Sequence, residues 1–273
     1  MSKTVFAAIQ MASSPNVSAN LIEAGRLIEK AASAGAALIV LPENFAIMGQ
    51  SETDKLAVAE TDGSGPIQDF LAKTAERLKV WLVGGTMPIR AGNDKVRAAC
   101  LVYNDKGNRA GRYDKIHLFD VNVPGTEEKY HESNTIDAGS EALVLDTPFG
   151  RLGLSICYDL RFPELFRQMA EVGMDILVVP SAFTAQTGAA HWETLVRARS
   201  IENLCYTIAA NQGGFHVNGR ETFGHSMIVD PWGQVLGVLP QGAGAVTAEF
   251  DPDRLQKVRA AFPALTHRKL RCR

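Results

Sequence analysis

Two short apolar runs constrain the fold more than any other feature of this sequence: ALIVLP at 37–42 and DILVVP at 175–180. A nearly continuous apolar run of this length is typical of a strand that is buried on both faces. Each run lies in a similar longer segment (31–45 and 169–183), where a helix end, a glycine, a strand and a proline follow one another. The sequence therefore predicts an α/β protein with two similar halves, sheets inside and helices outside.

Similar apolar runs and amphipathic stretches alternate along the rest of the chain. Their periodicity predicts strands at 4–11, 80–85, 96–103, 108–113, 151–156, 206–211, 225–230 and 234–239, and helices at 17–34, 66–79, 163–172, 189–204 and 252–261. A short strand is expected before the last helix. Because no linker rich in Pro, Gly or Ser interrupts this order, we expect one domain over residues 1–273.

Composition excludes several classes of protein. The 273 residues include 28 Lys and Arg against 30 Asp and Glu, and this near-neutral balance argues against nucleic acid as a partner. The longest uncharged stretches, such as 231–248, are broken by Pro, Gly and Gln, so no membrane span or signal peptide is expected. The cysteines lie far apart without a CxxC pair, which favours a reducing, cytoplasmic location over a zinc ribbon or disulfide framework: Cys100, Cys157, Cys205 and Cys272.

Three reactive residues follow predicted strands, where functional groups of α/β proteins gather. Glu43 follows ALIVLP, Lys115 ends a probable strand in GRYDKIHLF, and Cys157 follows GLSI just before a helix begins. A helix N-terminus and a nearby cation both favour the thiolate, which is the nucleophilic form of cysteine. Because the other cysteines lack such a turn, Cys157 is the candidate nucleophile.

A thiol that attacks an amide needs a base for its proton and positive or N–H groups for the developing oxyanion. Glu43 is the candidate base, and Lys115 is the candidate cation. Three histidines keep a Cys/His arrangement open: His117, His191 and His225.

Three segments, LPENF, GRYDKIHLFDV and GLSICYDLRFPEL, resemble in order and spacing the signature segments of the nitrilase (carbon–nitrogen hydrolase) superfamily. The resemblance runs nearly end to end and includes HWETLVRARSIENLCYTIAANQ and GHSMIVDPWG. It implies an α-β-β-α sandwich that pairs through helices into a homodimer or higher homo-oligomer. It also implies a small-molecule amide as substrate, with no metal and no organic cofactor.

The resemblance also implies a role for each residue of the matching motifs. Glu43 becomes the general base, Lys115 the oxyanion-stabilising cation and Cys157 the nucleophile that forms a thioester. Glu132, in YHESN, matches a second glutamate that positions the lysine or assists proton transfer. The backbone N–H of Tyr158 is expected to help hold the oxyanion.

Within the superfamily, these segments look most like the amidase branch that holds deaminated glutathione amidase and ω-amidase. The expected reaction is hydrolysis of a small carboxylate-bearing amide to an acid and ammonia. Deaminated glutathione is the first expected substrate, and α-ketoglutaramate is the alternative. A non-catalytic binding protein on the same scaffold stays a more distant alternative, because a fold does not determine a function.

Substrates of this kind carry carboxylates, so a basic side chain is expected in the pocket. Arg161 could bind such a carboxylate, or it could hold its own loop through an ion pair. Phe183 and Thr184, just beyond DILVVP, are expected pocket-wall residues. The polar segment 120–134 is either a mobile cover of the site or an ordinary surface loop.

Overall fold

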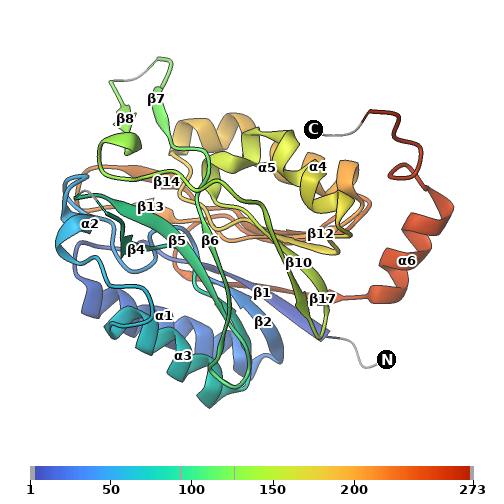
Figure 1. Ribbon diagram of the computed structural model, residues 1–273, viewed down its shortest axis with the longest axis horizontal. Helices are drawn as coiled ribbons and strands as arrows, with labels where there is room; N and C mark the ends of the chain where they lie inside the picture. The colour runs from blue at the N-terminus through green and yellow to red at the C-terminus, as the bar shows by residue number, and fades with distance from the viewer. Residues whose placement is uncertain (1–3, 93, 126, 271–273) are drawn as a thin grey trace.

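The computed structural model describes residues 4–92, 94–125 and 127–270. Two β-sheets lie face to face between two pairs of helices (Figure 1). Helices α1 (Val17–Ser33) and α3 (Pro66–Leu78) cover one sheet, and α4 (Pro163–Glu171) and α5 (Ala185–Asn203) cover the other. This arrangement is the α-β-β-α sandwich that the sequence predicted.

The first sheet places three parallel strands between antiparallel neighbours. Its order is β17-β1-β2-β3-β5-β4, and β6 also pairs with β5. The central strands pair in register, with Phe6 opposite Leu38 and Val40 opposite Val83. The strands of this sheet are β1 (Thr4–Gln10), β2 (Ala36–Val40), β3 (Trp81–Val83), β4 (Met87–Arg90), β5 (Val96–Tyr103), β6 (Arg109–Asp114) and β17 (Gly244–Phe250).

The second sheet repeats this pattern with the order β16-β15-β12-β11-β10-β9. Strands β10, β11 and β12 are parallel, as β1, β2 and β3 are, and their outer neighbours are antiparallel. The two similar apolar runs of the sequence form β2 and β11, each the middle strand of its parallel trio. The strands are β9 (Leu143–Thr147), β10 (Gly150–Leu154), β11 (Ile176–Val178), β12 (Tyr206–Ala209), β15 (Ser226–Val229) and β16 (Val235–Leu239).

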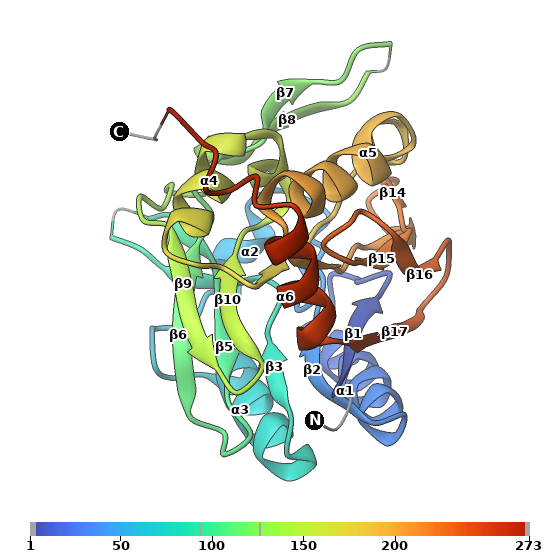
Figure 2. The same ribbon diagram turned by 90° about the vertical axis from the view of Figure 1, so that its right-hand side faces the viewer.

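Several short elements were not predicted, because they are short or polar. They are α2 (Asp54–Ala57), β4, β9, the hairpin β7 (Asp120–Asn122)–β8 (Lys129–His131), the hairpin β13 (Gly213–Phe215)–β14 (Glu221–Phe223), and the 3₁₀ turns η1 (Glu132–Asn134) and η2 (Cys157–Arg161). The β7–β8 hairpin falls in the segment 120–134 and projects from the body of the molecule in both views (Figures 1 and 2). The strand before α6 (Pro252–Ala261) is long rather than short, since β17 has seven residues.

Capping interactions explain where α1 begins and ends and where α5 begins. The side chain of Asn16 accepts the N–H of Ala19 at 3.0 Å and begins α1, and Gly35, with a φ of +89°, follows its end. Helix α5 begins at Ala185, four residues before the predicted start, because the Thr184 hydroxyl accepts the N–H of Thr187 at 3.2 Å. Among the described residues, no helix has both the length and the apolar character needed to cross a membrane.

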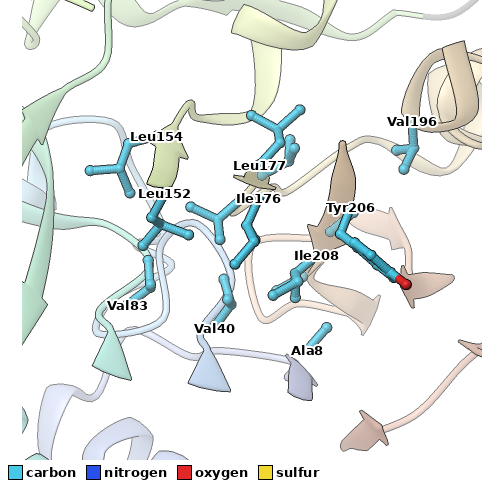
Figure 3. Packing of buried hydrophobic residues seen from close by; sticks show 14 of the residues in the cluster. Ala8, Val40, Val83, Leu152, Leu154, Ile176, Leu177, Val196, Tyr206 and Ile208 are labelled. Atoms are coloured by element: carbon cyan, nitrogen blue, oxygen red, sulfur yellow. The ribbon is translucent and has the colours of Figure 1, made fainter. Parts of the chain in front are cut away.

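The facing sides of the two sheets form the main hydrophobic core (Figure 3). Side chains of the first sheet point toward those of the second, with Ala8, Val40 and Val83 on one side and Leu152, Ile176 and Ile208 on the other. All six are fully buried. This rigid double layer holds the strand ends from which the candidate site residues project.

Candidate active site

Glu43 lies just beyond the end of β2, on a backbone that is fixed on both sides. The side-chain amide of Gln212 donates to the carbonyl oxygen of Glu43 at 2.9 Å. The N–H of Asn44, at a φ of +58°, donates to the Thr86 hydroxyl at 2.8 Å. The Glu43 side chain is only 5% exposed, so its carboxylate is held inside the protein at a defined position.

Lys115 follows β6 and joins two carboxylates. Its ammonium Nζ lies 2.7 Å from Oε1 of Glu43 and 3.0 and 2.8 Å from the two carboxylate oxygens of Glu132. Oε2 of Glu132 also accepts the backbone N–H of Phe119 at 2.8 Å. With the lysine side chain 1% exposed, this is a buried ion cluster whose members satisfy one another.

Electrostatics keep Lys115 and Glu132 ionised at neutral pH. Burial by itself lowers the pKa of Lys115, but the negative charges of Glu132 and Glu43 more than offset it and hold that pKa well above 10.5. For Glu132, burial raises the pKa, while the charge of Lys115 outweighs this effect and leaves the pKa below 4.5. A fixed ammonium in a buried site can stabilise negative charge that develops on a reacting oxygen.

Cys157 is the first residue of η2, where the chain turns sharply off the end of β10. Its φ of +46° is strained for a residue other than glycine, and its N–H donates to the carbonyl of Pro180 at 2.8 Å. Burial raises the pKa of the Cys157 thiol well above 9.0, and the negative charge of Glu43 raises it further, against the lowering effects of Lys115 and the Ala182 N–H. The group is therefore a neutral thiol, and the Glu43 side chain lies beside it.

Asp159 holds the segments on either side of the site together, and the sequence analysis did not single it out. Its fully buried carboxylate accepts the Tyr113 hydroxyl at 2.7 Å and the N–H of Ile156 at 2.9 Å. It also accepts the N–H of His117 at 3.0 Å and lies 2.7 Å from Nδ1 of the same residue. Tyr113 and His117 flank the lysine, and Ile156 precedes the cysteine, so one carboxylate fixes both segments.

All eight residues predicted for the site line one narrow inner cavity of about 20 Å³. They are Glu43, Lys115, Glu132, Cys157, Tyr158, Arg161, Phe183 and Thr184. In this conformation the cavity has room for about one water molecule, so a substrate must displace some of the side chains that line it. Arg220 also lines this cavity and was not predicted, since it lies in the polar turn before β14, where no periodic pattern marks a position.

Arg161 forms no ion pair with a carboxylate within the described ranges, so the expected alternative of a loop-fixing ion pair is not observed. Its Nη1 atom lies 3.2 Å from Nδ1 of His191, and its guanidinium carbon lies 5.4 Å from the ring centroid of Phe183. A guanidinium that lies over an aromatic ring and has no carboxylate partner is suited to bind an anionic ligand. Thr184 lines the cavity and also caps α5, so its hydroxyl has a structural function as well.

The histidines that kept a Cys/His arrangement open lie elsewhere. No histidine is among the described residues that line the inner cavity. His117 bonds to Asp159, and Nδ1 of His225 lies 2.9 Å from the carbonyl oxygen of Phe223. The geometry therefore favours Glu43 as the base.

The other described cysteines, Cys100 and Cys205, are free and fully buried, and Cys272 lies outside the described residues. Neither Cys100 nor Cys205 lines the inner cavity. In the part of the chain that the structure describes, no three His, Cys, Asp or Glu side chains form a cluster suited to a metal ion.

The family model of carbon–nitrogen hydrolases matches residues 6–260 of this chain. The chain therefore belongs to the carbon–nitrogen hydrolase family, and it is an amidase of the nitrilase superfamily. Deaminated glutathione amidase of Synechocystis sp. is 46% identical to it, over 96% of this chain and 97% of that protein. These findings confirm the resemblance that the sequence motifs indicated.

Solved structures agree with this assignment. The NitFhit protein of C. elegans superposes with a TM-score of 0.91 at 37% identity, covering 98% of this chain, which spans 65% of that longer chain. Nit3 of Saccharomyces cerevisiae, a member of branch 10 of the nitrilase superfamily, superposes with a TM-score of 0.88 at 32% identity, over 98% of this chain and 97% of that one. The fold is thus that of the superfamily throughout.

Proposed function

We propose that this protein hydrolyses deaminated glutathione through a thioester on Cys157. The observation that carries the proposal is the buried cluster of Glu43, Lys115 and Glu132 beside that thiol, in one cavity. The name of the Synechocystis relative supports the substrate. Retaining three buried charges is costly for stability unless they serve a purpose, which argues against the non-catalytic alternative.

In the first half of the reaction, the Cys157 sulfur attacks the amide carbon and forms the new C–S bond. Glu43 takes the thiol proton and passes it to the leaving nitrogen as the C–N bond breaks. The oxyanion is held by the Lys115 ammonium and the N–H of Tyr158, the second residue of η2. The N–H groups of the first turn of a helix have no acceptor within the helix, so this one can donate to substrate.

In the second half, water attacks the thioester. Glu43 accepts a proton from the water, and the proton returns to the sulfur as the C–S bond breaks. The free carboxylic acid and the resting thiol are regenerated. Glu132 stays bound to Lys115 throughout and keeps the ammonium directed into the cavity.

The leaving group depends on the substrate, and this corrects the expectation of ammonia. Glutathione is γ-glutamyl-cysteinyl-glycine and has no primary amide. In deaminated glutathione a keto group stands in place of the amino group, so hydrolysis at the γ-carbonyl releases cysteinylglycine and 2-oxoglutarate. Ammonia leaves only from α-ketoglutaramate, which yields the same 2-oxoglutarate.

The acyl part is therefore common to both candidate substrates, and Arg161 is suited to its carboxylate. The guanidinium lines the inner cavity and has no carboxylate partner among the described residues. A charge-assisted hydrogen bond of this kind contributes about 1.5–3 kcal/mol. Phe183 and Thr184 form the adjoining wall.

Release of 2-oxoglutarate from each substrate, measured side by side with Cys157→Ala as the blank, tests the proposal. Preferential hydrolysis of deaminated glutathione is the expected result. Preference for α-ketoglutaramate would make the protein an ω-amidase with the same mechanism. No release above the blank from either substrate would overturn the proposed substrate class.

We also propose one catalytic domain, a cytoplasmic location and a homodimer or higher homo-oligomer paired through helices. Ile201 of α5, Trp232 and Phe262 are 47%, 57% and 53% exposed, and the rings of Trp232 and Phe262 lie 5.5 Å apart. Such an apolar surface is suited to a second copy of the chain. Light scattering tests the pairing: a monomeric mass would contradict it. Cell fractionation tests the location.

A further inference from the structure

A larger outer cavity adjoins the inner one and has no place in the mechanism above. Its volume is about 290 Å³, close to the lower limit for small-molecule sites. Asn44, Phe119, Glu132 and Arg220 line both cavities, so the two spaces share a boundary. Arg161 and Phe183 line only the inner one.

Arg220 lies on that boundary and has a hydrogen-bond donor without a partner. Its Nη2 donates to the Ala182 carbonyl at 2.5 Å, and its guanidinium carbon lies 4.9 Å from the ring centroid of Tyr130. Its Nε is buried and has no hydrogen-bond partner, and the residue forms no ion pair within the described ranges. A buried guanidinium N–H without an acceptor is destabilising, and a bound carboxylate would satisfy it.

Apart from the exposed Lys129, the other charged groups that line the outer cavity have partners. Lys55 pairs with Glu52 at 2.6 Å, and Glu132 is held by Lys115. Glu128 accepts the Tyr130 hydroxyl at 3.3 Å. Lys129, also in the lining, is an exposed residue of β8. Arg220 is thus the cation best placed to bind an anion that extends from the inner cavity.

We propose that the outer cavity is a subsite for the leaving group, and that Arg220 binds the carboxylate at the far end of a peptidic amine. This inference rests on the proposed function. The acyl group lies on the Arg161 side of the scissile bond, so the leaving group extends to the other side, where the space is larger. Cysteinylglycine carries such a carboxylate, whereas ammonia does not reach the subsite. Arg220 therefore selects the peptide-derived substrate over the primary amide.

Steady-state kinetics of 2-oxoglutarate release tests this with three substrates: deaminated glutathione, its C-terminal amide, and α-ketoglutaramate. For Arg220→Gln we expect kcat/KM on deaminated glutathione to fall about 10- to 100-fold, mainly through KM. The loss on α-ketoglutaramate should be at least roughly tenfold smaller. Arg220→Lys, which keeps the charge, should recover part of the loss. The remote variant Lys73→Gln removes an exposed cation of α3 and should match the wild type on every substrate.

Comparing deaminated glutathione with its C-terminal amide on the wild-type enzyme gives a test that does not depend on the folding of a variant. The wild-type enzyme should prefer the free carboxylate to its amide by a similar factor, and Arg220→Gln should lose that preference. Equal wild-type rates on the acid and the amide would overturn the subsite, as would equal losses on the long and short substrates. A wild-type enzyme that releases no 2-oxoglutarate from deaminated glutathione would instead overturn the proposed function, and the subsite with it.

Discussion

Replacing Asp159 by asparagine keeps its shape but removes the charge that joins the segments beside Lys115 and Cys157. The buried carboxylate accepts hydrogen bonds from Tyr113 and Ile156 on one oxygen, and faces His117 with the other. In asparagine, one of the two oxygens becomes an NH₂ group. Two donors then lose an acceptor whichever way the amide turns.

The asparagine amide can adopt two orientations, and the less costly one turns its NH₂ group toward Tyr113 and Ile156. In this orientation the tyrosine hydroxyl can rotate and accept a hydrogen bond from the NH₂ group. The buried N–H of Ile156 is then left unsatisfied, which costs about 1–3 kcal/mol. The bonds to His117 persist, but to a neutral acceptor, and each is weaker. Together these changes amount to roughly 3 kcal/mol of unfolding free energy, or about 6–12 °C in melting temperature for a chain of this size.

Calorimetry and kcat on the same preparations measure both consequences of Asp159→Asn. We expect the melting temperature to fall by about 6–12 °C and kcat to fall roughly tenfold or more, because small misplacements of reacting groups are costly. Asp146→Asn is the matched control, since the Asp146 side chain is 89% exposed. A melting temperature and kcat that match those of the control would refute the reasoning.

Four further predictions follow from the site. Glu132→Gln leaves Lys115 with one carboxylate fewer and should lower kcat about 100-fold in a folded protein, as circular dichroism would verify; an unchanged kcat would exclude a role for that carboxylate. Because the pKa of Glu132 is lowered from 4.5, its ionised form stabilises the fold above that pH, and this stability is lost as the pH falls below it. Urea unfolding at pH 7 and pH 4 should show a smaller difference for Glu132→Gln than for the wild type, and equal differences would contradict the ion pair. The raised pKa of Cys157 predicts slow labelling by iodoacetamide at neutral pH, with a rate that still rises above pH 9.0; peptide mapping that shows a plateau below pH 8 would rule this out. Gly85→Ala would place a Cβ 2.0 Å from the Pro42 carbonyl oxygen at a φ of +53°, so it should cost roughly 3 kcal/mol and disturb the adjoining Glu43; full stability and activity would be inconsistent with this packing.

The layered fold was predictable because its main elements carry strong local signals. The runs that form β2 and β11 are apolar throughout, which indicated buried parallel strands, and their similarity indicated two related halves. The short hairpins and α2 lacked such signals, since they are polar and are stabilised by the rest of the protein. Residues 120–134 could be assigned only as a loop for the same reason.

The residues of the candidate site were likewise only partly predictable from the sequence. Glu43, Lys115 and Cys157 lie at strand ends in recognisable motifs, and the structure brings them into one cavity, although their chemical roles stay predictions. Asp159 and Arg220 could not be distinguished from surface residues of the same type. Their importance depends on burial and on partners distant in sequence, such as Tyr113 for Asp159 and Ala182 for Arg220.

The most direct test of the account is to trap the thioester. Wild-type protein mixed with deaminated glutathione, quenched in acid and measured by intact mass spectrometry should carry one acyl group derived from 2-oxoglutarate. Peptide mapping should place it on Cys157, and Cys157→Ala should carry none. Turnover without any adduct on the wild type, or turnover by Cys157→Ala, would contradict the covalent mechanism.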